Sequence, residues 1–133
     1  MELIITRLEL EEHIALYEKN DAQTSFFCGA LYGRAELPVQ FSSFCDYAAA
    51  LSRTTDGMEI HLYIVRHESQ REGALRLVRA RMQAMMRADV QKMLGGEYET
   101  YIARMRAYEH GNYIFLLATA DNDKTIEIIR SIL

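Results

Sequence analysis

The sequence predicts a single-domain α+β protein, with an antiparallel or mixed sheet and helices mainly on one face. Three segments of the 133-residue chain support this class. Residues 58–66 alternate in the two-residue period of a strand, and residues 70–94 repeat apolar side chains at helical spacing. A turn signal around Gly111 precedes a continuous apolar run and so indicates a β-hairpin, which favours antiparallel pairing. The chain contains no linker-like stretch that would divide residues 1–133 into domains.

Residues 58–66 carry the clearest strand pattern. Ile60, Leu62 and Ile64 occupy alternate positions, and β-branched and aromatic side chains are frequent among them. The turn-forming pair Asp56-Gly57 comes directly before. We therefore expect one face of this strand to be fully buried and the other face partly buried.

Residues 70–94 form the longest periodic segment. Ser69 is expected to cap this helix together with Glu72 as a capping box, and Gly95-Gly96 is expected to end it. Apolar side chains follow three- and four-residue steps, as on the buried stripe of an amphipathic helix. The stripe consists of Leu75, Val78, Met82, Met85, Met86 and Met93.

The rest of the second half completes the order β-α-α-β-β-α. Residues 98–105 repeat at helical spacing and predict a shorter helix. His110-Gly111-Asn112 is the turn of the hairpin, whose second strand covers residues 113–120. Residues 121–123 are expected to cap a last helix that buries Ile126, Ile129 and Leu133.

The first third has weaker signals. Residues 8–19 are expected to form a helix, residues 25–32 a strand, and a second helix is expected from Ser42 or Ser43 through Leu51. Two cysteines, Cys28 and Cys45, match no zinc or redox spacing, so we expect them to be unpaired, buried thiols.

Composition limits the class of protein and its location. Half of the residues are hydrophobic and 26% are charged, which is typical of a globular domain rather than a disordered chain. The apolar run 114–118 is far shorter than the roughly 20 residues of a membrane-spanning helix. The start, Met1 to Ile5, lacks the features of a secretory signal. We expect a cytoplasmic protein, or one of the cell envelope if a leader has been removed.

No motif predicts a catalytic, cofactor-binding or metal-binding residue. The sequence contains no phosphate-binding loop, nucleophile elbow or zinc-protease motif. His61 and His67 share one strand parity, but six residues of strand separate them by about 20 Å, too far to share a metal. Glu9 and His13 have helical spacing, although one such pair binds a metal weakly without further ligands.

The charge distribution predicts an interaction surface. Residues 66–92 hold seven basic and three acidic residues, a local excess of +4 that leaves −8 for the rest of a chain whose net charge is −4. An acidic chain argues against nucleic-acid binding, which depends on neutralising phosphates. The candidate surface consists of Arg76, Arg79, Arg81, Arg87 and Asp89.

Two features of the long helix have alternative interpretations. Asp89 lies near the middle of the apolar stripe, so either the helix has passed the edge of the sheet at that point or the carboxylate is paired. Met82, Met85, Met86 and Met93 are typical of core filling, and also of adaptable binding surfaces. Core filling is the simpler explanation.

These observations favour a non-enzymatic binding or protein-interaction domain, whose partner is a second copy in a homodimer or an acidic protein. Charges of opposite sign on separate parts of one molecule promote such association. The alternative is a small enzyme or ligand-binding protein with a cleft against the sheet, using Asp89 or His61. A deep pocket with convergent polar groups would favour this alternative.

The second half also resembles a known bacterial family. The resemblance covers about residues 56–133 and rests on the strand 59–65, the Arg-rich helix after it, a Tyr-bearing helix, and the strand that opens with Gly111-Asn112-Tyr113. This pattern is similar to an uncharacterised family of small Firmicutes lipoproteins, classified as a domain of unknown function. The resemblance implies the same α+β fold, and it implies no active site, because the family has none assigned.

Overall fold

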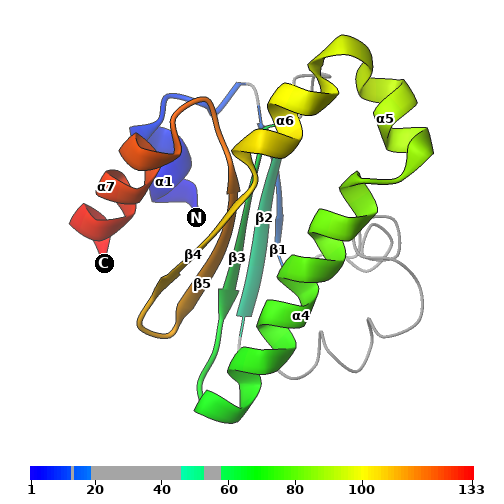
Figure 1. Ribbon diagram of the computed structural model, residues 1–133. Coiled ribbons are helices and arrows are strands. Elements are labelled where there is room, and N and C mark those ends of the chain that lie inside the picture. Colours follow the sequence, from blue (N-terminus) through cyan, green and yellow to red (C-terminus); the bar gives the residue numbers. More distant parts are fainter. Residues whose placement is uncertain (13, 19–45, 53–57) are drawn as a thin grey trace.

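Five antiparallel strands form the centre of the fold, in the order β1-β2-β3-β5-β4 (Figure 1). The computed structural model describes residues 1–12, 14–18, 46–52 and 58–133. It confirms the α+β class, and every strand pairing within these residues is antiparallel. The strands are β1 (Ile14–Glu18), β2 (Asp46–Ser52), β3 (Glu59–Ile64), β4 (Arg106–His110) and β5 (Tyr113–Ala118).

The predicted strand and hairpin both occur, and together they form the middle of the sheet. β3 lies between β2 and β5, and β4 pairs with β5 through a two-residue turn. Gly111 in that turn has φ 56°, a left-handed conformation that glycine adopts without steric cost. Because β3 and β5 have neighbours on both sides, their backbone groups are fully used within the sheet.

One face of the sheet is covered by α4 (Glu68–Met85) (Figure 1). Its buried residues Ala74, Leu77 and Val78 pack in one cluster with side chains from β2, β3 and β5. The helix begins after His67, not after Ser69 as expected. Gln70 Oε1 accepts hydrogen bonds from the backbone N–H groups of Arg66 and His67 there, and so takes the place predicted for Glu72.

The opposite face is covered by α1 (Glu2–Arg7) and α7 (Asn122–Ile132), which corrects the expectation of helices mainly on one face (Figure 1). The central strands explain the difference, because side chains on both of their faces are buried. On β3, His61 and Tyr63 are fully buried under α4, while Ile60 and Leu62 are buried on the side of α1 and α7. A strand whose side chains are buried on both faces requires cover on both.

The long helix predicted over residues 70–94 is interrupted. After α4, Met86 remains helical but Arg87 is extended (φ −67°, ψ 149°), and a separate helix, α5 (Ala88–Leu94), follows. A 3₁₀ turn, η1 (Gly95–Glu97), leads to α6 (Tyr98–Arg104). The order is therefore β-α-α-α-β-β-α, with η1 between the second and third of these helices. The break lets Val90 of α5 pack with Met85 and Tyr101 in a third small core.

Two predictions for the first third are wrong. Within 8–19, residues Ile14–Glu18 form β1, and the helix lies earlier, at Glu2–Arg7. The helix predicted to reach Leu51 is instead β2, where pairing with β1 and β3 overrides the helical preference of three consecutive alanines. Other predictions lie outside the described residues: the strand at 25–32, the turn at 56–57, His13, Cys28 and Cys45.

Leu62→Ala should destabilise the protein by about 2–5 kcal/mol, because Leu62 is buried in the core beneath α1 and α7 and its removal leaves a cavity. Leu3→Ala is the matched control. Leu3 is half exposed, so its truncation should change the free energy of unfolding by only about 0.5 kcal/mol. Urea unfolding of the two variants measures both values, and equal losses would contradict the assignment of Leu62 to the core.

Candidate functional site

A buried carboxylate at the start of β3 is the most unusual group among the described residues. Glu59 is 1% exposed and His61, two residues later on the same strand, is fully buried. Alternate residues of a strand point to the same face, so both side chains lie on the side of α4. Their contact is short, with His61 Nε2 2.8 Å from Glu59 Oε2. A carboxylate only accepts hydrogen bonds, so this nitrogen carries the proton.

Two helices bring further donors to the same carboxylate. The Tyr101 hydroxyl of α6 donates to Glu59 Oε1 at 2.6 Å. From α4, Arg81 approaches Oε2 with both Nε and a terminal nitrogen at 3.0 Å. The Tyr47 hydroxyl of β2 lies 3.1 Å from His61 Nδ1 and completes the group. We call Tyr47, Glu59, His61, Arg81 and Tyr101 the Glu59 network.

The Glu59 network keeps its carboxylate ionised. Burial by itself would raise the pKa of Glu59, but attraction to His61 and Arg81 and hydrogen bonds from His61 and Tyr101 outweigh it and lower the pKa to about 2. Burial raises the pKa of Tyr101, and the neighbouring negative charge of Glu59 raises it further. Tyr101 therefore acts as a neutral hydrogen-bond donor.

The arrangement is suited to holding elements together and is poorly suited to catalysis. Both oxygens of Glu59 are occupied by donors from β3, α4 and α6, and Glu59, His61 and Tyr101 are all at most 3% exposed. Within the described part of the chain, no buried side-chain polar atom lacks a partner. A general base needs access to its substrate's proton, and this network offers no such route.

The structure separates the residues of the predicted interaction surface. Arg76 and Arg79 lie on the exposed side of α4, where both approach Glu72, at 3.9 and 2.7 Å. Arg81 does not belong to that surface, because its side chain is 12% exposed and points to Glu59.

The break between α4 and α5 decides the position of the acidic member of this set. Arg87 and Asp89 lie at the start of α5, 3.5 Å apart, and the Asp89 side chain is 74% exposed. The Asp89 carboxylate, which an unbroken helix would have buried, is therefore on the surface. An exposed carboxylate remains hydrated and needs no partner inside the protein.

Sequence reasoning missed most of the Glu59 network. It singled out His61 as a candidate residue of an enzyme site and Arg81 as a member of an exposed interaction surface, and it assigned neither to a buried network. One signal was present: Glu59 and His61 are polar residues at strand spacing in an otherwise apolar segment, and two such side chains on one buried face need partners. Those partners, Tyr101 and Arg81, come from distant helices, and no spacing in the sequence indicates them.

Tyr101 also lines a small pocket of about 270 Å³. Its described lining comes only from η1 and α6, and consists of Gly96, Glu97, Thr100, Tyr101 and Arg104.

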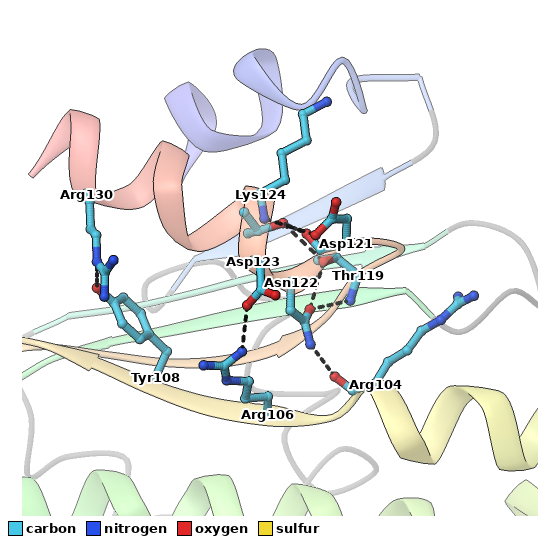
Figure 2. Close-up of polar contacts among 10 residues, drawn as sticks. Arg104, Arg106, Tyr108, Thr119, Asp121, Asn122, Asp123, Lys124 and Arg130 are labelled. Carbon is cyan, nitrogen blue, oxygen red and sulfur yellow. Dashed lines mark hydrogen bonds and ion pairs between the residues drawn. The ribbon is translucent and has the colours of Figure 1, made fainter.

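The end of α6 is fixed by the cap of α7, as Figure 2 shows. Asn122 donates its side-chain N–H to the carbonyl oxygen of Arg104 and accepts hydrogen bonds from the backbone and side chain of Thr119. Asp121 accepts from the N–H of Lys124, as predicted for the cap of the last helix.

In the described ranges, no three acidic, histidine or cysteine side chains are placed to share a metal ion. None of the helices described is both long and apolar enough to cross a bilayer. Comparison of the chain with protein-family models, curated proteins and solved structures finds no match. The resemblance to the Firmicutes lipoprotein family therefore stays a prediction.

Arg81→Met should destabilise the protein by about 3–5 kcal/mol, because it leaves the buried Glu59 carboxylate without its cation. The double variant Glu59→Gln/Arg81→Met removes both charges and should lose less stability than Arg81→Met alone. Chemical unfolding of the single and double variants measures the difference. A double variant less stable than Arg81→Met would contradict the assigned pairing.

The free energy of unfolding should fall as the pH drops from about 4.5 towards 2. The pKa of Glu59 is lower in the folded state than its ordinary value, so its stabilisation is present above the ordinary pKa and is lost as the folded pKa is approached. Glu59→Gln removes this contribution and should flatten the pH dependence over that window. Urea unfolding at several pH values tests this, and parallel curves for the two proteins would contradict it.

Proposed function

We propose that the protein is a non-enzymatic interaction domain that binds an acidic protein partner along the exposed side of α4 and α5. The observation that carries the proposal is the exposure of two large apolar side chains among cations. Met86, between the two helices, is 57% exposed, and Met93, near the end of α5, is 67% exposed. Figure 1 shows that α5 lies beyond the sheet, so the outer surface of this helix does not cover the strands.

The composition of this surface is typical of protein interfaces. Methionine and arginine are enriched in interfaces, and a methionine side chain adapts its shape to a partner at little cost. Met82 and Met85 of α4 pack in the cores instead, Met82 with the cluster between α4 and the sheet and Met85 with Tyr101. The exposed cations Arg87 and Lys92 are next to Met86 and Met93 in the sequence, and Arg76 and Arg79 are exposed earlier on α4.

Charge supports an acidic partner. Residues 66–92, which include α4 and most of α5, have a net charge of +4. The segments with α1 and α7, residues 1–12 and 121–133, hold seven acidic and three basic side chains, a net charge of −4. Because these helices cover opposite faces of the sheet, the described part of the molecule has a basic and an acidic side.

The same separation favours a different acidic protein over a homodimer. A two-fold dimer places the same surface of each copy against itself, so two basic α4 surfaces would meet and repel. Head-to-tail contact between the basic and acidic sides would not close into a dimer. An acidic segment of another protein avoids both problems and gains from steering by residues 66–92, whose net charge is +3 once the inward-pointing Arg81 is left out.

The ¹⁵N-labelled protein is titrated with a synthetic amphipathic helical peptide that has Leu on one face and Glu on the other. The peptide is expected to shift the amide resonances of residues 76–93. Charge reversal by Arg76→Glu/Arg79→Glu should weaken binding by about five-fold or more, since each reversed charge repels the peptide. The matched control Arg7→Glu/Lys124→Glu makes the same charge change on the acidic side and should leave the affinity unchanged. Binding should also weaken at high salt.

Three results would contradict the proposal. Shifts confined to α1 and α7 would place binding on the wrong side of the sheet. Equal weakening by the two charge-reversal variants would show that only net charge matters. A dimer mass in sedimentation equilibrium, lost on Met86→Glu/Met93→Glu, would assign the surface to a homodimer instead.

A further inference from the structure

We infer that the pocket on η1 and α6 binds a small zwitterion, one whose ammonium and carboxylate groups are separated by several ångströms, such as an ω-amino acid or a dipeptide. The site lies on α6 and is distinct from the surface proposed for the acidic partner. The inference is independent of that proposal.

The pocket combines one acidic and one basic side chain on one face of a helix. Glu97, Thr100, Tyr101 and Arg104 have spacings of three, four and seven residues, which place them on one face of α6. Glu97 precedes the first residue of the helix and Arg104 is its last, so their backbones are about 10 Å apart along the axis. A ligand between them meets a carboxylate at one end and a guanidinium at the other.

Both charged groups are available to a ligand. Among the described residues, neither the Glu97 nor the Arg104 side chain makes a hydrogen bond or ion pair, although Glu72 and Arg79 at the same seven-residue spacing do so on α4. Figure 2 shows the Arg104 side chain extending away from the contacts of Asn122, with only its backbone carbonyl engaged. A guanidinium binds a carboxylate through two parallel hydrogen bonds, and Glu97 accepts from an ammonium group.

The backbone and floor of the pocket are held in place before any ligand arrives. The Tyr101 hydroxyl is hydrogen-bonded to Glu59, and the Arg104 carbonyl accepts from Asn122, so the middle and the C-terminal end of α6 are held in place. A site that does not need to be ordered on binding loses less free energy to entropy.

The pocket is small and partly open to solvent, which suits a small ligand. Pockets for drug-sized molecules range over about 300–1,000 Å³, and this one is about 270 Å³. Gly96 contributes no side chain to its wall, and a Cβ added there would meet no atom within 4 Å. Gly96 also lacks the left-handed conformation of its neighbour Gly95, so a larger residue at 96 adds bulk at the pocket without backbone strain.

The test uses three compounds of equal length on the full chain: 6-aminohexanoate, adipate and hexane-1,6-diamine. Amide shifts of the ¹⁵N-labelled protein and calorimetry should show 6-aminohexanoate binding at Thr100, Tyr101 and Arg104 with a dissociation constant below about 10 mM. The dianion and the dication should bind at least about five-fold more weakly, because each one meets a like charge at one end. A short zwitterion, glycine, should bind more weakly as well.

Variants separate this site from non-specific binding. Glu97→Gln, Arg104→Gln and Gly96→Leu should each weaken 6-aminohexanoate binding by about five-fold or more, while Glu99→Gln, an equal charge change on the same helix but outside the pocket, should not. Circular dichroism checks that each variant is folded. Adipate binding as tightly as 6-aminohexanoate, loss of binding in Glu99→Gln, or no binding by any of the compounds would each overturn the inference.

Discussion

The position of one ionised carboxylate inside the protein constrains much of the rest of the structure. A charge taken out of water is strongly unfavourable unless it is paired and fully hydrogen-bonded. Glu59 meets this requirement only when Arg81 of α4 and Tyr101 of α6 are both in place, together with His61 of its own strand. A shift of either helix by a single turn would remove one donor and leave part of the carboxylate without a hydrogen bond. The network thereby selects one register for each helix, which apolar packing alone does not do.

This constraint explains how α5 and α6 are held although they contribute little to the main cores. Their own apolar cluster is small, formed around Met85, Val90, Tyr101 and Ala118. Three contacts hold the chain between α4 and β4 in place: Arg81 and Tyr101 bind Glu59, and the Arg104 carbonyl accepts a hydrogen bond from Asn122. Between these points α5 needs only Val90 to face inward, so Met86 and Met93 are free to be exposed. The proposed interaction surface and the proposed pocket both depend on these three attachments.

Elements with a strong local pattern were predicted from the sequence, and elements that depend on pairing were not. The hairpin follows from Gly111 and the apolar run after it, and α7 follows from its cap at Asp121. β2 could not be predicted, because Ala48, Ala49 and Ala50 favour a helix until β1 and β3 supply partners on both sides. The break at Arg87 carries no proline or glycine that would signal it in the sequence, and it accompanies the burial of Val90 beside Tyr101.

The same distinction applies to the candidate site, and it affects how polar residues in the sequence should be interpreted. Arginines on a helix are usually solvated, and Arg76 and Arg79 agree with that expectation, being exposed and close to Glu72. Arg81 is an arginine of the same helix, but its side chain points inward because the sheet beneath it contains a carboxylate. An arginine that lies over a strand with a buried acidic residue therefore belongs to the core as much as a leucine does. The basic surface of α4 is smaller by one cation for this reason. Its exposed arginines, Arg76 and Arg79, are followed along the chain by Arg87 and Lys92, which are next to the exposed Met86 and Met93 in the sequence.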